Sequence, residues 1–242
     1  LAVLRKHEEA VYCAEFSADG QFIVTATGDG MAIIWDIVGR EIATCQGHQR
    51  PIYGVQFTLN NQFVLTASGD HTACLWDVTG RLITTFRGHE GTLYQAQFSP
   101  DEELIATASA DKTARLWNRN GQELAVLYGH QGIVNTVQWS QDGQLIVTAS
   151  EDGTARVWDR LGRELVVLQG HHSWVRTAEF SSDGQWVLTA STDGTAKLWP
   201  LVSLDNLLNK GCEWLQDYLH HNPLVNPADR QLCSCNPKDE TL

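Results

Sequence analysis

The chain has 242 residues, of which 43% are hydrophobic and 19% are charged, so it has room for one large folded domain or two small ones. Its formal net charge is −12, which leaves no basic excess to neutralise phosphates. This charge argues against a general binder of nucleic acid or of anionic membranes. We therefore expect no nucleic-acid ligand. No apolar run approaches the length of a transmembrane helix, so we also expect no membrane span.

The first residue and the cysteines bear on where such a chain works. The sequence begins with Leu1 and shows no positively charged leader before an apolar segment, which predicts no signal peptide. Because Leu1 is not Met, we interpret the sequence as a piece of a longer chain. Its six cysteines lack the regular spacing of a disulfide framework, which is typical of a reducing compartment, so we expect a cytoplasmic protein.

A repeat of 41 residues runs through most of the chain. Four kinds of residue return at this spacing: Trp at 35, 76, 117, 158 and 199; His at 7, 48, 89, 130 and 171; Asp at 29, 70, 111, 152 and 193; and a hydroxyl residue at Thr27, Ser68, Ser109, Ser150 and Ser191. Five copies cover residues 1–200. Self-similarity at such a period is the signature of a repeat architecture.

Each copy predicts four short strands. In the fourth copy the strands are 124–127, 134–139, 144–150 and 154–159, and turns rich in Gly and Asp separate them. No sustained helical period interrupts residues 1–200. A four-stranded unit of this size leaves a sheet face uncovered, so we expect the copies to stack face to face in a ring.

The motifs of the copies then resemble a known family. Gly-His pairs stand at 47–48, 88–89, 129–130 and 170–171, and Trp-Asp stands at 76–77 and 158–159. In these features residues 1–200 resemble the WD-repeat β-propellers, with Lys6, Asn118 and Pro200 as departures from the motif. The resemblance implies an all-β β-propeller of four-stranded blades. It also implies a non-catalytic scaffold for protein–protein interaction.

The repeated Ser, His and Asp admit a second interpretation. Together they have the composition of a hydrolase triad, with Ser68, Ser109, Ser150 or Ser191 as the nucleophile. Two observations argue against catalysis. An enzyme needs one such set, whereas this chain has five equivalent sets, and each set occurs in a repeat with a Trp whose indole N–H needs a hydrogen-bond partner if it is buried. The resemblance implies instead a structural network in which Asp bonds His, His bonds the Ser or Thr hydroxyl, and the hydroxyl accepts from Trp.

The resemblance also implies a partner-binding rim around the His and Asp loops. By position in the repeat, the residues expected there are Tyr12, Tyr53, Tyr94, Asn135, Glu151, Trp174 and Arg176. Strand alternation alone would place the tyrosines in the core with the alternate apolar residues. In the family a β-bulge at this point turns them outward, which the residues themselves do not reveal.

Two further groups of residues have the composition of a binding site. Arg115, Arg156 and Lys197 recur in register, and we interpret them as a solvated edge that discourages aggregation rather than as a groove for an acidic segment. His220, His221, Cys233 and Cys235 match no usual zinc spacing. We therefore expect no metal and no cofactor.

The last residues, 201–242, read as a helical extension. Ser203 is a suitable N-cap, apolar residues at helical spacing predict a helix over about 204–220, and Asn226-Pro227 fits a second start running toward Cys233. This ending is similar to the C-terminal segments of cyanobacterial WD-repeat signalling proteins. It suggests the sensor or regulatory region of a larger bacterial signalling protein.

The number of blades stays open at this point. The segment 1–4 aligns with the first strand of the fourth copy, so it could pair with the last repeat and close a ring of five. Alternatively, upstream repeats complete a larger ring, which the missing Met favours. The oligomeric state and the identity of the partner are not predicted.

Overall fold

Short β-strands make up the regular structure of residues 3–201, the part of the chain that the computed structural model describes. They are five or six residues long and rich in Val, Ile, Thr and aromatic residues, which favour the extended backbone. Tight turns join them, many with a Gly at positive φ. This described part is all-β and contains no helix, as expected; the predicted helix over 204–220 and the second start at Asn226-Pro227 lie outside it.

The strands form five antiparallel sheets in chain order. The first four sheets have four strands each: β1 (Val11–Phe16), β2 (Phe22–Thr27), β3 (Met31–Asp36) and β4 (Glu41–Gln46); β5 (Ile52–Phe57), β6 (Phe63–Ser68), β7 (Thr72–Asp77) and β8 (Leu82–Arg87); β9 (Leu93–Phe98), β10 (Leu104–Ser109), β11 (Ala114–Asn118) and β12 (Glu123–Leu127); β13 (Val134–Trp139), β14 (Leu145–Ser150), β15 (Thr154–Asp159) and β16 (Glu164–Gln169). The fifth sheet has three: β17 (Val175–Phe180), β18 (Trp186–Ser191) and β19 (Ala196–Pro200).

Each complete sheet combines strands from two successive copies of the repeat. Its fourth strand, such as β8, belongs to the copy that begins after the Trp-Asp pair. The expected strand at 1–4 would therefore be the outer strand of a preceding sheet. Residues 3 and 4 are not in a strand and do not extend the three-stranded sheet of β17–β19, so the described structure does not show the five-membered closure.

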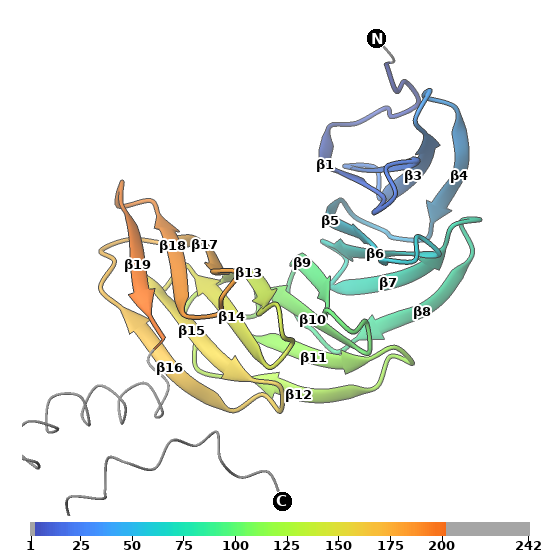
Figure 1. The fold of residues 1–242 in the computed structure, drawn as a ribbon. Coiled ribbons are helices and arrows are strands. Elements are labelled where there is room, and N and C mark those ends of the chain that lie inside the picture. The colour runs from blue at the N-terminus through green and yellow to red at the C-terminus, as the bar shows by residue number, and fades with distance from the viewer. Residues whose placement is uncertain (1–2, 202–242) are drawn as a thin grey trace, which may run out of the picture. The chain divides into compact units, whose positions relative to one another are not determined.

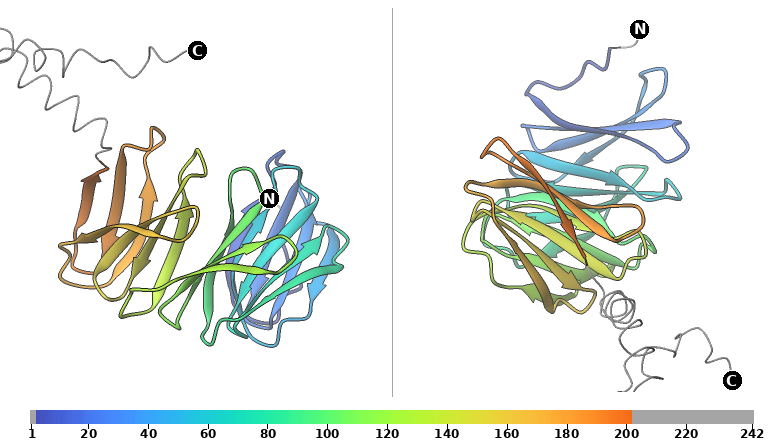
Figure 2. Two further views of the ribbon diagram at one scale, coloured as in Figure 1. Left: turned by 90° about the horizontal axis from the view of Figure 1, so that it is seen from below. Right: turned by 60° about the vertical axis from the view of Figure 1, so that its left-hand side comes forward.

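The sheets follow one another in a curved row within the unit Leu1–Trp199 (Figure 1). The first strands β1, β5, β9, β13 and β17 contact their successors and lie on the inner side of the curve, whereas β4, β8, β12 and β16 lie on the outer side (Figures 1 and 2). The first and the last sheet stand at opposite ends of this row. The five repeats are thus arranged like propeller blades, but the described residues do not close a ring.

The hydrophobic core lies between neighbouring sheets. One cluster joins Ile34 and Cys45 of the first sheet to Phe57 and Trp76 of the second, and equivalent clusters fill the next two junctions. The repeated Trp76, Trp117 and Trp158 are each 1% exposed. At the ends of the row the equivalent apolar positions lack a neighbour, so Phe16 is 60% exposed and Leu198 is 59% exposed.

A β-bulge interrupts the first strand of every sheet at the same position of the repeat. The pairing of the first two strands skips one residue each time, which leaves five residues without a ladder partner: Tyr12, Tyr53, Tyr94, Asn135 and Arg176. The bulge turns a strand that would otherwise alternate strictly, so these side chains leave the core face. This is the geometry that the family resemblance implied.

Candidate functional site

The five bulge residues form a line across the first strands, at the strand ends nearest the His and Asp loops. Tyr12 is 52% exposed, and Tyr53, Tyr94 and Asn135 are half-buried. The ring centroids of Tyr12 and Tyr53 lie 5.2 Å apart, and those of Tyr53 and Tyr94 lie 5.6 Å apart. The three predicted tyrosines therefore contact one another as a continuous aromatic ladder.

The remaining predicted residues form a second group at the far end of this line. The guanidinium of Arg176 lies over the ring of Trp174 at 5.0 Å from its centroid, and Arg176 Nη1 lies 3.6 Å from Glu151 Oε1. Burial raises the pKa of Tyr94, as do Tyr53 and Glu151, whereas Arg176 lowers it. Glu151, Trp174 and Arg176 thus form one contacting group.

Asn135 lies between the two groups, and its side chain makes one hydrogen bond within the protein. Its Nδ2 donates to the carbonyl oxygen of Val175 at 3.1 Å, which ties the fourth sheet to the fifth. The structure therefore brings the seven predicted residues onto one side of the sheets, as two contacting groups with Asn135 between them. We call these seven residues the tyrosine rim.

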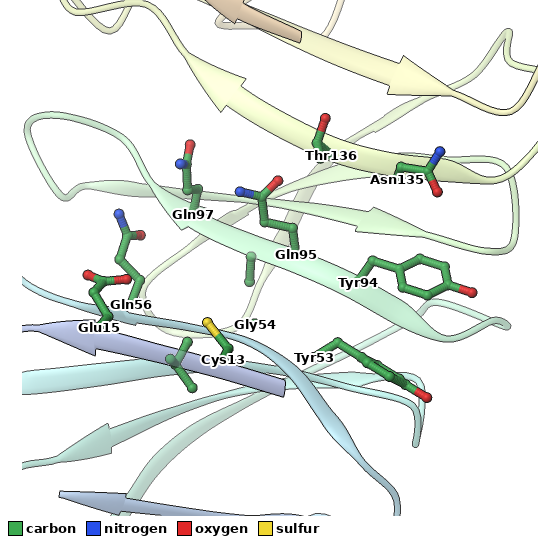
Figure 3. Close-up of a pocket in the computed structure, with 12 residues that line it drawn as sticks. Cys13, Glu15, Tyr53, Gly54, Gln56, Tyr94, Gln95, Gln97, Asn135 and Thr136 are labelled. Carbon is green, nitrogen blue, oxygen red and sulfur yellow. The ribbon is translucent and has the colours of Figure 1, made fainter. Parts of the chain in front are cut away.

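A cavity of about 280 Å³ opens beside the tyrosine rim, along the inner strands (Figure 3). Residues of four successive sheets line it: Cys13, Glu15, Tyr53, Gly54, Val55, Gln56, Tyr94, Gln95, Ala96, Gln97, Asn135 and Thr136. Thr136 Oγ1 is buried and has no hydrogen-bond partner among the described residues. Polar and apolar groups contribute equally to the wall, and Glu15 is its one carboxylate.

The side-chain amides of this wall also hold the sheets together. Gln56 Oε1 accepts from the backbone N–H of Phe98 at 2.8 Å, and Gln95 Oε1 accepts from that of Val137 at 3.0 Å. Glu15 Oε1 accepts from the N–H of Phe57 at 3.3 Å, and burial raises its pKa although this bond lowers it. None of these wall residues except Tyr53, Tyr94 and Asn135 is among the sites predicted from the sequence. The signal was available, because Glu15, Gln56, Gln97, Gln138 and Glu179 recur at the repeat spacing.

The expected Asp–His–hydroxyl–Trp network is present in four sheets and closes within one sheet. In the second sheet, His48 Nδ1 donates to Asp70 Oδ2 at 2.7 Å and Nε2 hydrogen bonds Thr66 Oγ1 at 2.8 Å. Trp76 Nε1 donates to the same hydroxyl at 2.9 Å. The same bonds recur around His89, His130 and His171.

The identity of the hydroxyl corrects the sequence-based expectation. The histidines bond Thr66, Thr107, Thr148 and Thr189, two residues before the serines that were expected. Ser68 lies at the strand end, where its Oγ donates to the main-chain carbonyls of Arg50 and Pro51 and accepts from the N–H of Asp70. The Ser–His contact that the hydrolase alternative needs is absent from this sheet.

The first sheet departs from the network. His7 Nε2 reaches Thr25 Oγ1 at 2.6 Å, but His7 Nδ1 and Asp29 Oδ2 are buried without a partner among the described residues. Asp29 instead accepts from the Thr27 hydroxyl and the N–H of Met31. Met31 stands where the other sheets carry a Thr whose hydroxyl donates to the Asp, so Asp29 has lost one of its fixed donors.

The expectation of a solvated basic edge was wrong. Arg115 Nη1 bonds Glu123 Oε2 at 2.6 Å, Arg156 bonds Glu164, and both arginine side chains are only about 15% exposed. Lys197 lies on β19, in the sheet that has no fourth strand. Two of the three cations are therefore paired between the third and fourth strands of their own sheets.

The described residues contain neither a metal-binding cluster nor a membrane-spanning helix. Within 3–201 no three His, Cys, Asp or Glu side chains gather in a way that could hold a metal ion. Over the same residues no helix has the length and apolar character needed to cross a bilayer. His220, His221, Cys233 and Cys235 lie outside the described part of the chain.

Comparison with known proteins assigns the repeats. The model of the family "WD domain, G-beta repeat" matches the chain five times, at residues 1–36, 39–77, 80–118, 121–159 and 162–200. No curated protein matches the chain. WD40 repeats generally mediate protein–protein interaction, and the family is typically a non-enzymatic scaffold. Since the matches cover most of the sequence, the chain belongs to the WD40 repeat family.

Proposed function

We propose that the chain is a non-catalytic interaction module that binds a protein or peptide partner at the tyrosine rim. The observation that carries this proposal is the aromatic ladder of Tyr12, Tyr53 and Tyr94, held outward by three successive bulges. Tyr and Trp contribute large contact area with little loss of side-chain entropy, and with Arg they dominate the binding energy of protein interfaces.

The wall beside the rim supports the same role. After Gln56 and Gln95 have accepted from the neighbouring strands, their Nε2 groups and the Thr136 hydroxyl remain to bond a ligand. A wall with amide donors next to an aromatic edge suits a peptide segment, whose carbonyl groups accept from such donors. Nucleic acid is disfavoured by the net charge of −12.

The setting of the module is a further part of the proposal. We place it in the cytoplasm and in a bacterial signalling protein, on the basis of its cysteine usage and of the resemblance of residues 201–242 to cyanobacterial relatives. The division into repeats over 1–200 and an extension over 201–242 stays a prediction as well.

The proposal is tested by comparing variants for capture of the same partner. Immobilised wild-type protein, the double variant Tyr53→Ala/Tyr94→Ala and the control Tyr128→Ala would be exposed to lysate of the source organism, and the retained proteins identified by mass spectrometry. Tyr128 is 70% exposed and lies after the outer strand β12, so it is a matched tyrosine away from the rim. Circular dichroism would verify that all three proteins fold.

We expect the double variant to lose a partner that wild type and Tyr128→Ala retain. The dissociation constant of that partner should then rise at least about tenfold, since interface tyrosines of this kind contribute more than 1 kcal/mol each. If all three proteins retain the same partners equally, the rim is not the binding surface.

A further inference from the structure

The three tyrosines of the rim are inclined to one another rather than stacked. The ring planes of Tyr12 and Tyr53 make an angle of 56°, and those of Tyr53 and Tyr94 make an angle of 46°. Parallel rings would present one flat surface, whereas inclined rings leave a wedge between each successive pair. The aromatic ladder therefore offers two wedges, and each of them suits a short, compact apolar group rather than another flat ring.

Two glycines support the rings of this ladder. A Cβ on Gly28 would lie 3.4 Å from Tyr12 Cε2, and a Cβ on Gly69 would lie 3.3 Å from Tyr53 Cε2. Both rings thus lie close against the backbone, and their inclination is set before a partner binds. A preformed site loses less entropy on binding than one that the partner must first arrange.

The cavity wall beside the ladder supplies amide donors. Gln56 Oε1 and Gln95 Oε1 each accept from a backbone N–H of the following sheet, at 2.8 and 3.0 Å. This leaves Nε2 as the end of each amide that can bond a ligand. Gln95 follows Tyr94 directly on β9, and Gln56 lies farther along the wall (Figure 3). These two amides suit a ligand that brings carbonyl oxygens and few N–H groups.

A proline-rich segment matches both the wedges and the donors. Proline has no backbone N–H, so it brings carbonyl oxygens to Gln56 and Gln95 without adding an N–H that would be buried there unpaired. Its pyrrolidine ring is compact and apolar, and aromatic grooves are the surfaces on which proline-rich segments dock. In the polyproline II conformation the backbone has no internal hydrogen bonds, so its carbonyl oxygens are free to accept.

The dimensions of the ladder agree with this ligand. The ring centroids of neighbouring tyrosines lie 5.2 and 5.6 Å apart. One turn of a polyproline II helix has three residues and advances about 9 Å along its axis. One turn is therefore long enough to contact all three rings.

We infer that the partner segment at the tyrosine rim is a proline-rich stretch in the polyproline II conformation. The inference rests on the proposed function, because it names the chemistry of the partner at the same site. Tyr12, Tyr53 and Tyr94 hold the pyrrolidine rings in the two wedges. Gln95 Nε2 donates to a backbone carbonyl oxygen of the segment next to Tyr94.

The test begins with a library of random twelve-residue peptides displayed on phage. The library would be selected on the immobilised full chain, and each recovered peptide then measured for binding to wild type, Tyr53→Ala/Tyr94→Ala and the control Tyr128→Ala. We expect peptides that lose binding only to the double variant. In these peptides proline should be enriched at least about threefold over the unselected library, as its docking on aromatic grooves predicts.

The strongest of these peptides then tests the contacts one by one. It would be synthesised with a fluorescent label, and its dissociation constant measured by anisotropy. Replacement of its prolines by alanine should raise the dissociation constant at least about tenfold, since the preformed helix and the pyrrolidine contacts are both lost.

Gln95→Glu isolates the donor of the wall. The variant keeps an oxygen that can accept from the N–H of Val137 but has no Nε2, so the dissociation constant should rise several-fold. Gln46→Glu makes the same change of charge at an exposed position of the outer strand β4, so it should leave binding unchanged. Equal dissociation constants for wild type and Gln95→Glu would overturn the role of this donor.

The selection separates failure of the inference from failure of the proposed function. Peptides that need the two tyrosines but show no enrichment in proline would overturn the inference and leave the rim as a binding surface. If no recovered peptide depends on the two tyrosines, the rim is not the binding surface, and the proposed function fails together with the inference.

Discussion

Trp117 Nε1 donates to Thr107 Oγ1 at 2.9 Å, and through this bond the largest buried side chain of the third sheet is fixed to the network of His89 and Asp111. The hydroxyl serves two partners at once, so each member of the network satisfies a polar group that is buried with it. A repeated set of residues with the composition of a catalytic triad thereby acts as a structural clamp in four of the five described sheets. Removal of one member leaves another buried group without a partner.

The first prediction concerns this clamp. Asp111→Ala removes the acceptor of His89 Nδ1 and of the Thr113 hydroxyl, so we expect it to lower the free energy of unfolding by about 1–3 kcal/mol. Urea denaturation followed by tryptophan fluorescence measures the change. Asp29→Ala is the control, because Asp29 does not bond His7, and it should cost clearly less. Equal losses in both variants would contradict the network as the source of the stability.

The choice of hydroxyl shows what the sequence alone could not determine. Thr107 and Ser109 both recur at the repeat spacing and lie two residues apart, so strand alternation places both on one face. The two hydroxyls differ in their position along the strand. Thr107 lies level with the buried ring of Trp117, whereas Ser109 lies beside the turn, where the carbonyl of Gly91 takes its hydroxyl.

The tyrosine rim shows the opposite case. The position of these residues follows from the motif spacing. The outward direction of their side chains depends on a β-bulge, and no residue type near Tyr53 predicts that bulge. The glutamines Gln56 and Gln97 recur in register, but residue type and spacing do not show that their side chains face a cavity, which only the structure reveals.

The second prediction uses one position of the repeat in two environments. Phe57 is 6% exposed between the first and second sheets, whereas Phe16, at the same position in the first sheet, is 60% exposed. Phe57→Ala should lower the free energy of unfolding by about 3 kcal/mol or more, because it leaves a cavity in a packed junction. Phe16→Ala should change it by less than about 1 kcal/mol. Thermal and urea unfolding of both variants would measure the difference, and similar losses would show that Phe16 is covered in solution.

The third prediction concerns pH. Burial raises the pKa of Glu15 above its ordinary value of 4.5, so the charged carboxylate is disfavoured in the folded protein. The stability linked to the protonated form is fully present below the unfolded pKa and is lost as pH rises through the folded pKa. Glu15→Gln keeps the acceptor for the N–H of Phe57 and cannot ionise, so it should raise the melting temperature at neutral pH by more than it does in acid.

Glu179→Gln provides the control for this effect. Glu179 occupies the same position of the repeat in the fifth sheet but is exposed, so its replacement should change the melting temperature little at either pH. Differential scanning calorimetry of the two variants and wild type at acid and neutral pH would compare them. A gain for Glu15→Gln that is equal at both values would show that ionisation of Glu15 is not its cause.

The last prediction concerns the incomplete hydrogen-bond network of the first sheet. In the second sheet the Thr72 hydroxyl donates to Asp70 Oδ1 at 2.6 Å and lies 3.3 Å from His48 Nδ1, and this arrangement recurs at Thr113 and Thr154. Met31 holds the equivalent position in the first sheet, where Asp29 Oδ2 and His7 Nδ1 are left buried without partners among the described residues. Met31→Thr supplies the missing hydroxyl and should turn Asp29 toward His7, which would raise the free energy of unfolding by about 1 kcal/mol. Met31→Ala removes the same side chain without adding a hydroxyl, so it separates the new hydrogen bond from the lost packing. If Met31→Thr is no more stable than Met31→Ala in urea, the hydroxyl at this position is not what completes the network in the other sheets.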